Sequence, residues 1–134
     1  MASNNGNGKY KKYILDTSAV IAQLANESGA GKISQIKSSA FLPFVVLSEL
    51  YYIMWNKKGK AEADRFYGIV KGWNRPVLQP NERVILNAGR FKAIYKLGIA
   101  DSYIAAFALD NDAIVVTKDT DYRKLEKEIS IYWL

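Results

Sequence analysis

Four acidic residues stand where a carboxylate is unusual: Asp16, Glu49, Asp101 and Asp119. Asp16 follows the apolar run YIL, and Asp119 follows the run AIVVT after one lysine. If both runs are parallel strands, the two aspartates meet at one edge of a sheet, because ligands gather beyond the carboxyl ends of such strands. Carboxylates without nitrogen or sulfur ligands select hard cations, Mg²⁺ or Mn²⁺. A site of this kind can activate water and stabilise the charge of a phosphodiester.

Glu49 stands in the stretch 41–55, which is otherwise almost entirely apolar or aromatic, with Ser48 beside it. A helix of this composition is expected to be largely buried. A buried carboxylate without a partner destabilises the folded protein unless it takes up a proton. Either a salt bridge with a lysine or arginine or a shared metal ion would satisfy Glu49, and the sequence leaves both open.

The aspartates also have a purely structural interpretation. Asp16, Asp101 and Asp119 each precede an expected helix, and aspartate is a favoured N-cap residue. For any one of them, capping is the better explanation. Taken together they favour a site, because a helix N-terminus also stabilises the ionised carboxylate that a metal ion requires.

Two residue types are absent. The 134 residues contain no cysteine and no histidine. Their absence excludes disulfides, thiol catalysis, Ser-His-Asp catalysis and metal sites that use either side chain. The net charge of +6, from 19 basic and 13 acidic residues, favours anionic partners such as nucleic acid, although charge alone is weak evidence.

The elements that would position the acidic residues alternate between strand and helix. The sequence predicts strands at 10–15, 40–42, 76–78, 113–116 and 129–133, and helices at 17–26, 32–37, 44–56, 60–73, 82–97, 102–109 and 120–127. We expect Asn81 to cap the fifth helix at its N-terminus and Gly98 to cap it at its C-terminus. This order predicts an α/β sandwich with a central, mainly parallel sheet of about five strands.

The organisation of the chain is simple. Residues 1–8 (MASNNGNG) are expected to be a disordered leader or a remnant of cloning, and residues 9–134 a single domain. Without an apolar run of about 20 residues or a signal-peptide pattern, we expect a soluble, cytoplasmic protein that does not contact a membrane.

Residues 10–133 resemble a PIN domain, and most closely the VapC-like toxins of bacterial and archaeal toxin–antitoxin pairs. The resemblance rests on ILDTSAVIA at 14–22, SELYYI around Glu49, LGIADSYIAAFAL at 97–109 and IVVTKDTDY at 114–122. A single Asp-Thr-Ser would mean little, but all four landmarks agree in order, spacing and local context.

The resemblance implies an α/β/α sandwich whose acidic residues hold a divalent metal ion at the C-terminal edge of the sheet. Asp16, Glu49, Asp101 and Asp119 match the four acidic positions of the family. Asp16 and Asp101 are the expected direct Mg²⁺ ligands, Mn²⁺ being possible, and Glu49 and Asp119 complete the site. The supporting residues would be Thr17, Ser18, Thr117 and Asp121, and Asp121 is an alternative for the fourth acidic position.

The implied reaction is metal-dependent hydrolysis of RNA phosphodiester bonds, leaving a 5′-phosphate and a 3′-hydroxyl. The resemblance also implies a homodimer and a cognate antitoxin protein. An RNA groove is expected beside the site, and a solvated charged surface explains its basic residues equally well. These residues are Lys57, Lys58, Lys60 and Arg65, with Lys71 and Arg75 nearby. The aromatic-rich range 44–73 is the first candidate for a partner surface.

Alternatives remain within the fold: an RNA-processing PIN nuclease, or a silent PIN domain that binds RNA or protein without cutting. The four filled acidic positions argue against a silent domain. Phospho-acceptor receivers need adjacent acidic residues after the first strand, and haloacid-dehalogenase-type phosphatases need a second aspartate two residues after the first. Thr17 and Ser18 stand at those positions, so we set both classes aside.

Overall fold

A single parallel sheet lies at the centre of the molecule. The computed structural model describes residues 11–134, and the expected leader 1–8 lies outside this range. The five strands lie in the order β3-β2-β1-β4-β5, and every neighbouring pair is parallel. They are β1 (Tyr13–Leu15), β2 (Ala40–Pro43), β3 (Val77–Leu78), β4 (Ile114–Thr117) and β5 (Ser130–Trp133). The predicted α/β sandwich is confirmed, and its sheet is wholly rather than mainly parallel.

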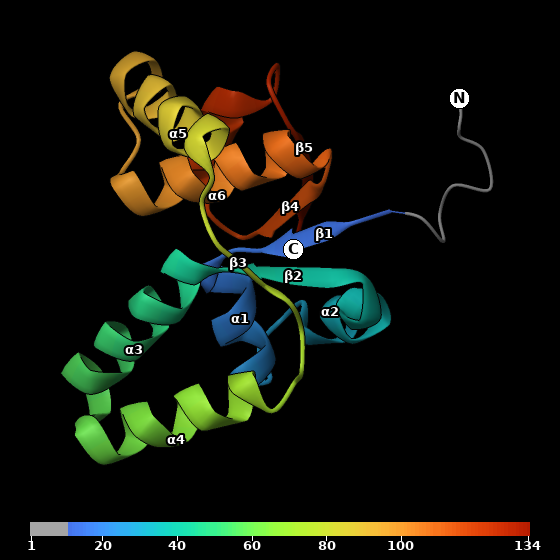
Figure 1. Ribbon diagram of the computed structural model, residues 1–134. Helices are drawn as coiled ribbons and strands as arrows, with labels where there is room; N and C mark the ends of the chain where they lie inside the picture. The colour runs from blue at the N-terminus through green and yellow to red at the C-terminus, as the bar shows by residue number, and fades with distance from the viewer. Residues whose placement is uncertain (1–10) are drawn as a thin grey trace.

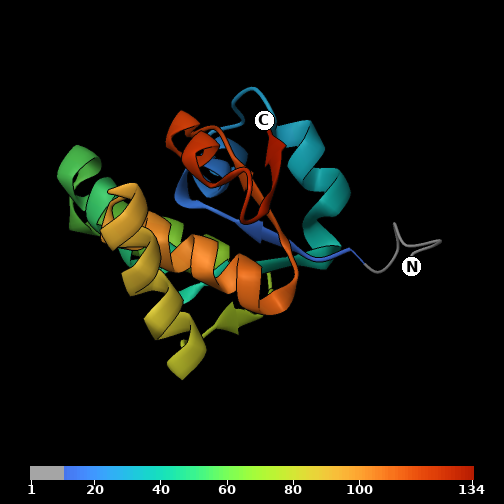
Figure 2. The ribbon, with the colours of Figure 1, turned by 90° about the horizontal axis from the view of Figure 1, so that it is seen from above.

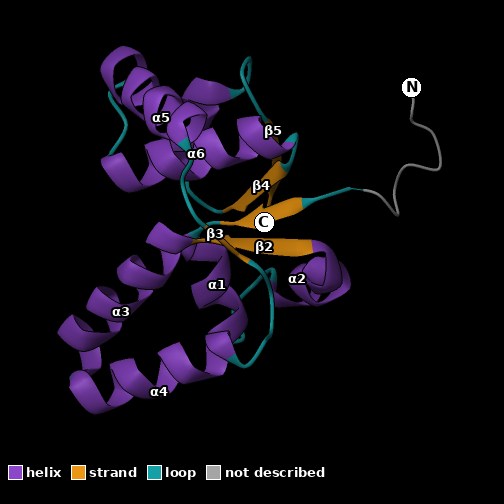
Figure 3. Ribbon diagram, in the orientation of Figure 1, coloured by secondary structure: helices purple, strands orange, loops and turns teal. Residues whose placement is uncertain are grey.

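Helices cover both faces of this sheet (Figures 1 and 3). One side carries α1 (Thr17–Leu24), α2 (Ala30–Ile36), α3 (Phe44–Lys58) and α4 (Lys60–Lys71). The other carries α5 (Glu82–Tyr95) and α6 (Ile99–Asn111), which Figure 2 shows from above. Two short 3₁₀ helices, η2 (Lys37–Ser39) and η3 (Thr120–Leu125), precede β2 and β5.

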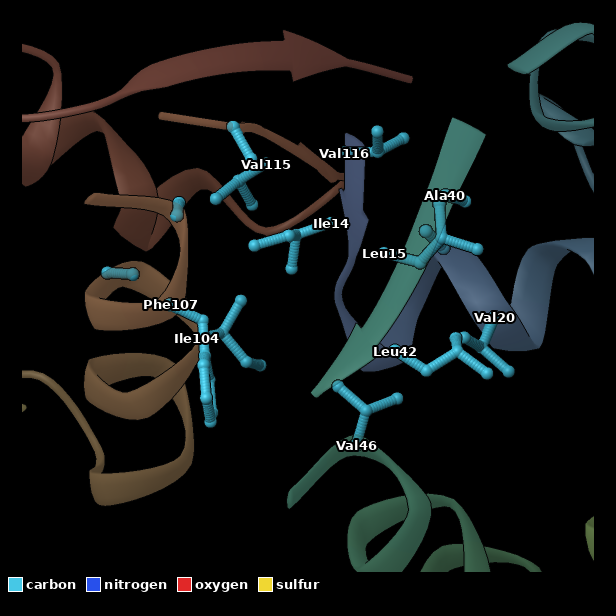
Figure 4. Packing of buried hydrophobic residues seen from close by; sticks show 14 of the residues in the cluster. Ile14, Leu15, Val20, Ala40, Leu42, Val46, Ile104, Phe107, Val115 and Val116 are labelled. Carbon is cyan, nitrogen blue, oxygen red and sulfur yellow. The ribbon is translucent and has the colours of Figure 1, made fainter. Parts of the chain in front are cut away.

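The central strands are buried on both faces, as their continuous apolar sequences indicate. Ile14 pairs with Val115 and Leu15 with Val116, and all four side chains are inaccessible to solvent. Successive side chains of a strand point to opposite faces. In Figure 4, Ile14 therefore points to the side where α6 packs, and Leu15 points to the side of α1. This packing fixes the ends of β1 and β4 next to each other.

The predicted start of α5 is confirmed and its predicted end is wrong. The Asn81 side chain accepts a hydrogen bond from the Val84 amide and caps the helix. The helix ends at Tyr95 because Lys96 adopts the left-handed conformation, with φ 59°, and donates its amide to Lys92. Gly98 is extended and is instead the N-cap residue of α6. Asp101 therefore lies inside the first turn of α6 and does not cap it.

The prediction that α3 is largely buried holds for one face only. Leu50 and Met54 pack into the core with Val46 and Leu47, whereas Tyr52 and Trp55 are 54% and 46% exposed. Gly59, at φ 90°, reverses the chain into α4, and the two helices project together from the sheet (Figure 1). Only one side of this hairpin meets the rest of the domain. Within residues 11–134, no helix has both the length and the apolar character needed to cross a membrane.

Candidate active site

Asp16 lies at the carboxyl end of β1 and is held by three hydrogen bonds. Its side chain is 3% exposed. Oδ1 accepts from the Ser18 hydroxyl at 2.7 Å and from the Ala19 amide at 2.9 Å, and Oδ2 accepts from the Thr117 hydroxyl at 2.5 Å. The Ala19 bond makes Asp16 the N-cap of α1, as predicted. The structure therefore fixes this carboxylate as the strand turns into the helix.

The hydroxyls of Ser18 and Thr117 connect this carboxylate to the end of β4. The Ser18 hydroxyl accepts a hydrogen bond from the Lys118 amide at 3.0 Å, and the Thr117 hydroxyl accepts one from the Asp119 amide at 2.8 Å. Each hydroxyl thus donates to Asp16 and accepts from the segment that carries Asp119. Two residues predicted to support the site lie in direct contact with it.

Asp101, Asp119 and Asp121 converge from two elements. Each offers one carboxylate oxygen, and these three atoms lie within 4.8 Å of one another. Asp101 comes from the first turn of α6, whereas Asp119 is the N-cap of η3 and accepts the Asp121 amide at 2.9 Å. The sequence offered Asp119 and Asp121 as alternatives, and the structure brings both to Asp101.

Glu49 lies on α3 and is not one of these three residues. It is half-buried, and its Oε1 accepts a hydrogen bond from the Thr17 hydroxyl at 2.6 Å. Thr17 follows Asp16, so this contact links α3 to the end of β1. No ion pair within residues 11–134 involves Glu49. The salt bridge considered from the sequence is therefore not present in the part of the chain that is described.

Burial and mutual repulsion make two of these carboxyl groups weaker acids than an ordinary aspartate. Burial raises the pKa of Asp16 to about 6 and exceeds the opposing effect of the hydrogen bonds from Thr117, Ser18 and Ala19. Burial also raises the pKa of Asp101 to about 6, and the negative charge of Asp119 adds to the shift. The negative charges of Glu49 and Asp16 make smaller contributions in the same direction.

The donor set of this acidic site fits a hard divalent cation. Asp16, Glu49, Asp101, Asp119 and Asp121 provide oxygen atoms alone, which Mg²⁺ and Mn²⁺ prefer. None of the five pairs with a lysine or arginine among residues 11–134. Carboxylates this close repel one another unless a cation or a proton intervenes. Their roles as ligands remain predictions.

Three of the six basic residues considered for RNA binding already have intramolecular partners. Lys60 pairs with Asp64 at 2.7 Å, and Arg65 pairs with Glu62 at 3.0 Å. Arg75 donates to the Ala40 carbonyl oxygen at 2.9 Å. Lys57 and Lys58 are exposed in the last turn of α3 and form no ion pair within the described range.

The sequence did not indicate the contact that holds Asp101. The hydroxyl of Tyr122, a fully buried residue of η3, donates to Asp101 Oδ1 at 3.2 Å. Tyr122 follows the acidic motif directly, but residue spacing cannot show that a buried ring reaches the first turn of α6 with its hydroxyl.

The fold and these carboxylates define an α/β domain with an acidic site at the C-terminal edge of a parallel sheet. The family model of the PIN domain matches residues 13–128, so the chain belongs to the PIN-domain family. This match confirms the resemblance seen in the sequence. No curated protein matches the sequence.

Several solved structures share the fold across nearly the whole chain. VapBC-1 from nontypeable Haemophilus influenzae has a TM-score of 0.72 at 22% identity, covering 90% of this chain and 96% of the other. DNA-bound VapBC from Salmonella typhimurium has a TM-score of 0.71 at 23% identity, covering 91% and 97%. VapC20 from Mycobacterium tuberculosis, described as a toxin that cleaves the sarcin–ricin loop, has a TM-score of 0.67 at 13% identity, covering 88% and 96%. At these identities the likeness establishes the fold.

Proposed function

We propose that this protein is a metal-dependent endoribonuclease that hydrolyses RNA phosphodiester bonds. The observation that carries the proposal is the convergence of Asp101, Asp119 and Asp121 within 4.8 Å, next to the buried Asp16. None of these carboxylates pairs with a lysine or arginine within residues 11–134. A divalent cation would offset the repulsion among these negative charges. Membership of the PIN family supports the same conclusion.

Asp16 and Asp101, the expected direct ligands, would hold Mg²⁺ or Mn²⁺ together with Asp119 and Asp121, and Glu49 would complete the acidic site. Such an ion, when bound, polarises a phosphoryl oxygen and makes water more acidic. The hydrogen bonds from Ser18 and Thr117 stabilise the charged form of Asp16 and fix its direction. The bond from Thr17 engages Oε1 of Glu49, so Oε2 is the oxygen that would accept a proton from the attacking water.

The exposed side of α3 is suited to RNA. Tyr52 lies three residues after Glu49 and presents an exposed ring on which a base can stack. Lys57 follows Glu49 by eight residues, which is about 12 Å along a helix. At that distance Lys57 and Lys58 would contact the phosphates that flank the cut bond. Lys60 and Arg65 would contribute less, because each already has a carboxylate partner.

We further propose that the protein is the toxin of a toxin–antitoxin pair and acts in the cytoplasm, where it meets RNA. The solved structures that share its fold include VapC20, described as a toxin, and a toxin–antitoxin complex from Klebsiella pneumoniae. An open groove of about 440 Å³ beside α3 would receive part of the antitoxin. Its walls are apolar and aromatic, and Lys71 lies among them with Ser48. The positive charge of Lys71 in this groove favours an acidic segment.

The proposed homodimer would form through the outer side of α5. Leu86 is 68% exposed there, with Ile85 at 48% and Ile94 at 60%. Gly89 lies in the middle of the helix, and a side chain at this position would contact no atom of the protein. Glycine inside a helix costs about 1 kcal/mol relative to alanine, so close approach of a second helix would explain it.

Charge complementarity favours a second copy of the chain as the occupant of this surface. We consider two copies of α5 that cross antiparallel about a two-fold axis at Gly89. A residue that precedes Gly89 by a given number of positions then faces the residue that follows Gly89 by the same number in the other copy. Glu82 of one copy would then face Lys96 of the other, at both ends of the crossing. Arg83 and Arg90 would not disturb this pairing, because Asp110 and Glu128 already neutralise them.

The nuclease is tested with mixed single-stranded RNAs in Mg²⁺, Mn²⁺ or EDTA. We expect cleavage that requires metal and leaves 5′-phosphate ends. Asp16→Asn should abolish it, whereas Asp112→Asn should not. Asp112 provides a matched control, since it lies at the other end of α6 in a left-handed conformation that asparagine also adopts. Metal binding by the native protein without cleavage of any RNA would indicate a silent PIN domain instead.

The toxin role is tested by inducing the chain in a bacterial host. We expect growth to stop with the native protein and to continue with Asp16→Asn at equal expression. Co-expression of the protein encoded beside it should restore growth. Normal growth with a preparation that cleaves RNA in vitro would favour the RNA-processing alternative.

A further inference from the structure

The largest fully buried side chain in the described part of the molecule is that of Tyr122, and it carries a hydroxyl. A phenylalanine would fill the same space without a polar atom that needs a partner. The Tyr122 hydroxyl has one hydrogen-bond partner among residues 11–134, Oδ1 of Asp101, at 3.2 Å. A buried hydroxyl directed at one carboxylate of the acidic site indicates a role beyond packing.

We propose that Tyr122 is a positioning residue that holds the Asp101 carboxylate in the orientation needed to bind the metal ion. This proposal rests on the proposed function, because Tyr122 can position a metal ligand only if the acidic site binds a metal ion. Tyr122 itself would not contact the ion or the RNA. Its hydroxyl would act only through Asp101.

The location of Tyr122 explains how it would set the spacing of the site. Asp119, Asp121 and Tyr122 belong to one short segment, in which Asp119 caps η3 and its carbonyl oxygen accepts the Tyr122 amide at 3.2 Å. Asp119 and Asp121 face the acidic site, whereas the Tyr122 ring is anchored in the core. The contact with Asp101 therefore connects α6 to the segment that supplies the other two carboxylates.

The chemistry of the contact is consistent with orientation. The Tyr122 phenol engages Oδ1 of Asp101, and Oδ2 accepts no hydrogen bond within the described residues. One oxygen is thus held and the other is left for a ligand. The distance of 3.2 Å exceeds the usual O–H···O value of about 2.7 to 2.8 Å, so the bond directs the carboxylate without adding much stability.

The test is Mn²⁺ binding, measured by calorimetry on the full chain at pH 8. Tyr122→Phe removes the hydroxyl and keeps the ring. Loss of a residue that orients a ligand typically weakens metal affinity about tenfold or more, and we expect the Mn²⁺ Kd to rise by at least that factor. The rise in Tm on adding Mn²⁺ should become smaller, while the Tm of the metal-free protein stays within a few degrees of native.

Tyr95→Phe is the matched control. The Tyr95 hydroxyl also donates to a carboxylate, Glu128, at 2.7 Å, but not to one of the acidic site. This variant should bind Mn²⁺ like the native protein. Equal Mn²⁺ affinity in Tyr122→Phe and native protein would overturn the positioning role, and so would an equal loss in both phenylalanine variants.

The outcomes for this proposal and for the nuclease are distinguishable. If the native protein binds Mn²⁺ and cleaves no RNA, the proposed nuclease activity is wrong. The role of Tyr122 is then still decided by comparing the Mn²⁺ affinities of Tyr122→Phe and native protein. If the native protein binds no Mn²⁺, the metal site is wrong and the positioning role is overturned with it.

Discussion

At the scale of single residues, Asp16 combines two demands that conflict in the absence of a cation. It accepts three hydrogen bonds and caps α1, which a carboxylate does well. It is also almost completely buried, and burial opposes its ionisation enough to bring its pKa to about 6. A bound divalent ion would remove the conflict, because the negative charge would then have a partner.

The first prediction concerns the stability of Asp16→Asn. In the folded protein the pKa is raised from 3.8 to about 6, so this group stabilises the fold below pH 4 and the contribution is lost as the pH rises through 6. A shift of this size corresponds to at most about 3 kcal/mol. Asparagine caps a helix as well as aspartate does and carries no charge. At pH 7.5 without metal, we expect the Tm of Asp16→Asn to equal or exceed the native Tm, measured by calorimetry.

The same variant should lose all cleavage, so stability and activity are expected to change in opposite directions. Mg²⁺ should raise the Tm of the native protein and have little effect on that of Asp16→Asn. A Tm several degrees below native in the metal-free variant would show that Asp16 is a structural residue whose negative charge the fold requires.

The second prediction concerns pH. Mn²⁺ must displace protons from Asp16 and Asp101 once the pH is below their pKa values of about 6. Affinity should be nearly constant above pH 7 and fall below pH 6, by about tenfold per pH unit for each proton displaced. Calorimetric titrations between pH 5 and pH 8 measure this slope. In Asp101→Asn the slope should be reduced, and an unchanged affinity down to pH 5 in the native protein would contradict the raised pKa values.

At the scale of elements, the site depends on where strands and helices end. β1 and β4 are neighbours, so Asp16 and the Thr117–Asp119 segment meet without any loop of unusual length. α6 contributes Asp101 from its first turn, and η3 begins at Asp119. Helix N-termini at these positions favour negative charge. Capping and the proposed ligation therefore involve the same residues at Asp16 and Asp119, whereas Asp101 lies in the first turn of α6 without capping it.

The third prediction separates these two roles at Asp119. Asp119→Asn should still accept the Asp121 amide and cap η3, so the Tm without metal should stay near the native value. Asp119→Ala removes the cap as well and should cost about 1 kcal/mol in the free energy of unfolding. Both variants should lose Mn²⁺ affinity by a similar factor. If asparagine retained native affinity, Asp119 would be a capping residue and Asp121 would fill the fourth acidic position.

The alternation of elements was predictable because it follows from patterns of adjacent residues. The short buried strands, the Asp16 cap and the Asn81 cap are all local features, and all were predicted. The end of α5 was not, since Lys96 rather than Gly98 adopts the left-handed turn. The range 44–73 was expected to offer a partner surface, but the burial of α3 was overestimated, because composition cannot show that the α3–α4 hairpin projects from the domain. The contact from Tyr122 to Asp101 joins residues 21 positions apart through the core, which no local pattern encodes.

At the scale of the whole molecule, the surface of residues 11–134 includes two separate apolar areas. One lies on α3 and α4, where Tyr52, Trp55 and Ile69 are exposed, and the other lies on α5 around Leu86. The two helical layers lie on opposite sides of the sheet (Figure 1), so the two areas can be covered by different partners at once. This arrangement is compatible with the proposal that RNA and an antitoxin bind at α3 and α4 and a second copy at α5.

The last prediction tests the dimer through its symmetry. In an antiparallel crossing at Gly89, Glu82→Lys would place like charges at both ends and should raise the dimer Kd about tenfold, as two exposed charge pairs of up to about 1 kcal/mol each imply. Lys96→Glu should do the same. The double reversal, Glu82→Lys with Lys96→Glu, should restore the native Kd in light scattering or sedimentation, because each charge again faces its opposite across the two-fold axis. Ile69→Lys on α4 is the control and should leave the dimer unchanged. If both single reversals weakened the dimer and the double reversal weakened it further, α5 would lie in the interface with a different crossing. A monomer at every concentration in the native protein would exclude the homodimer.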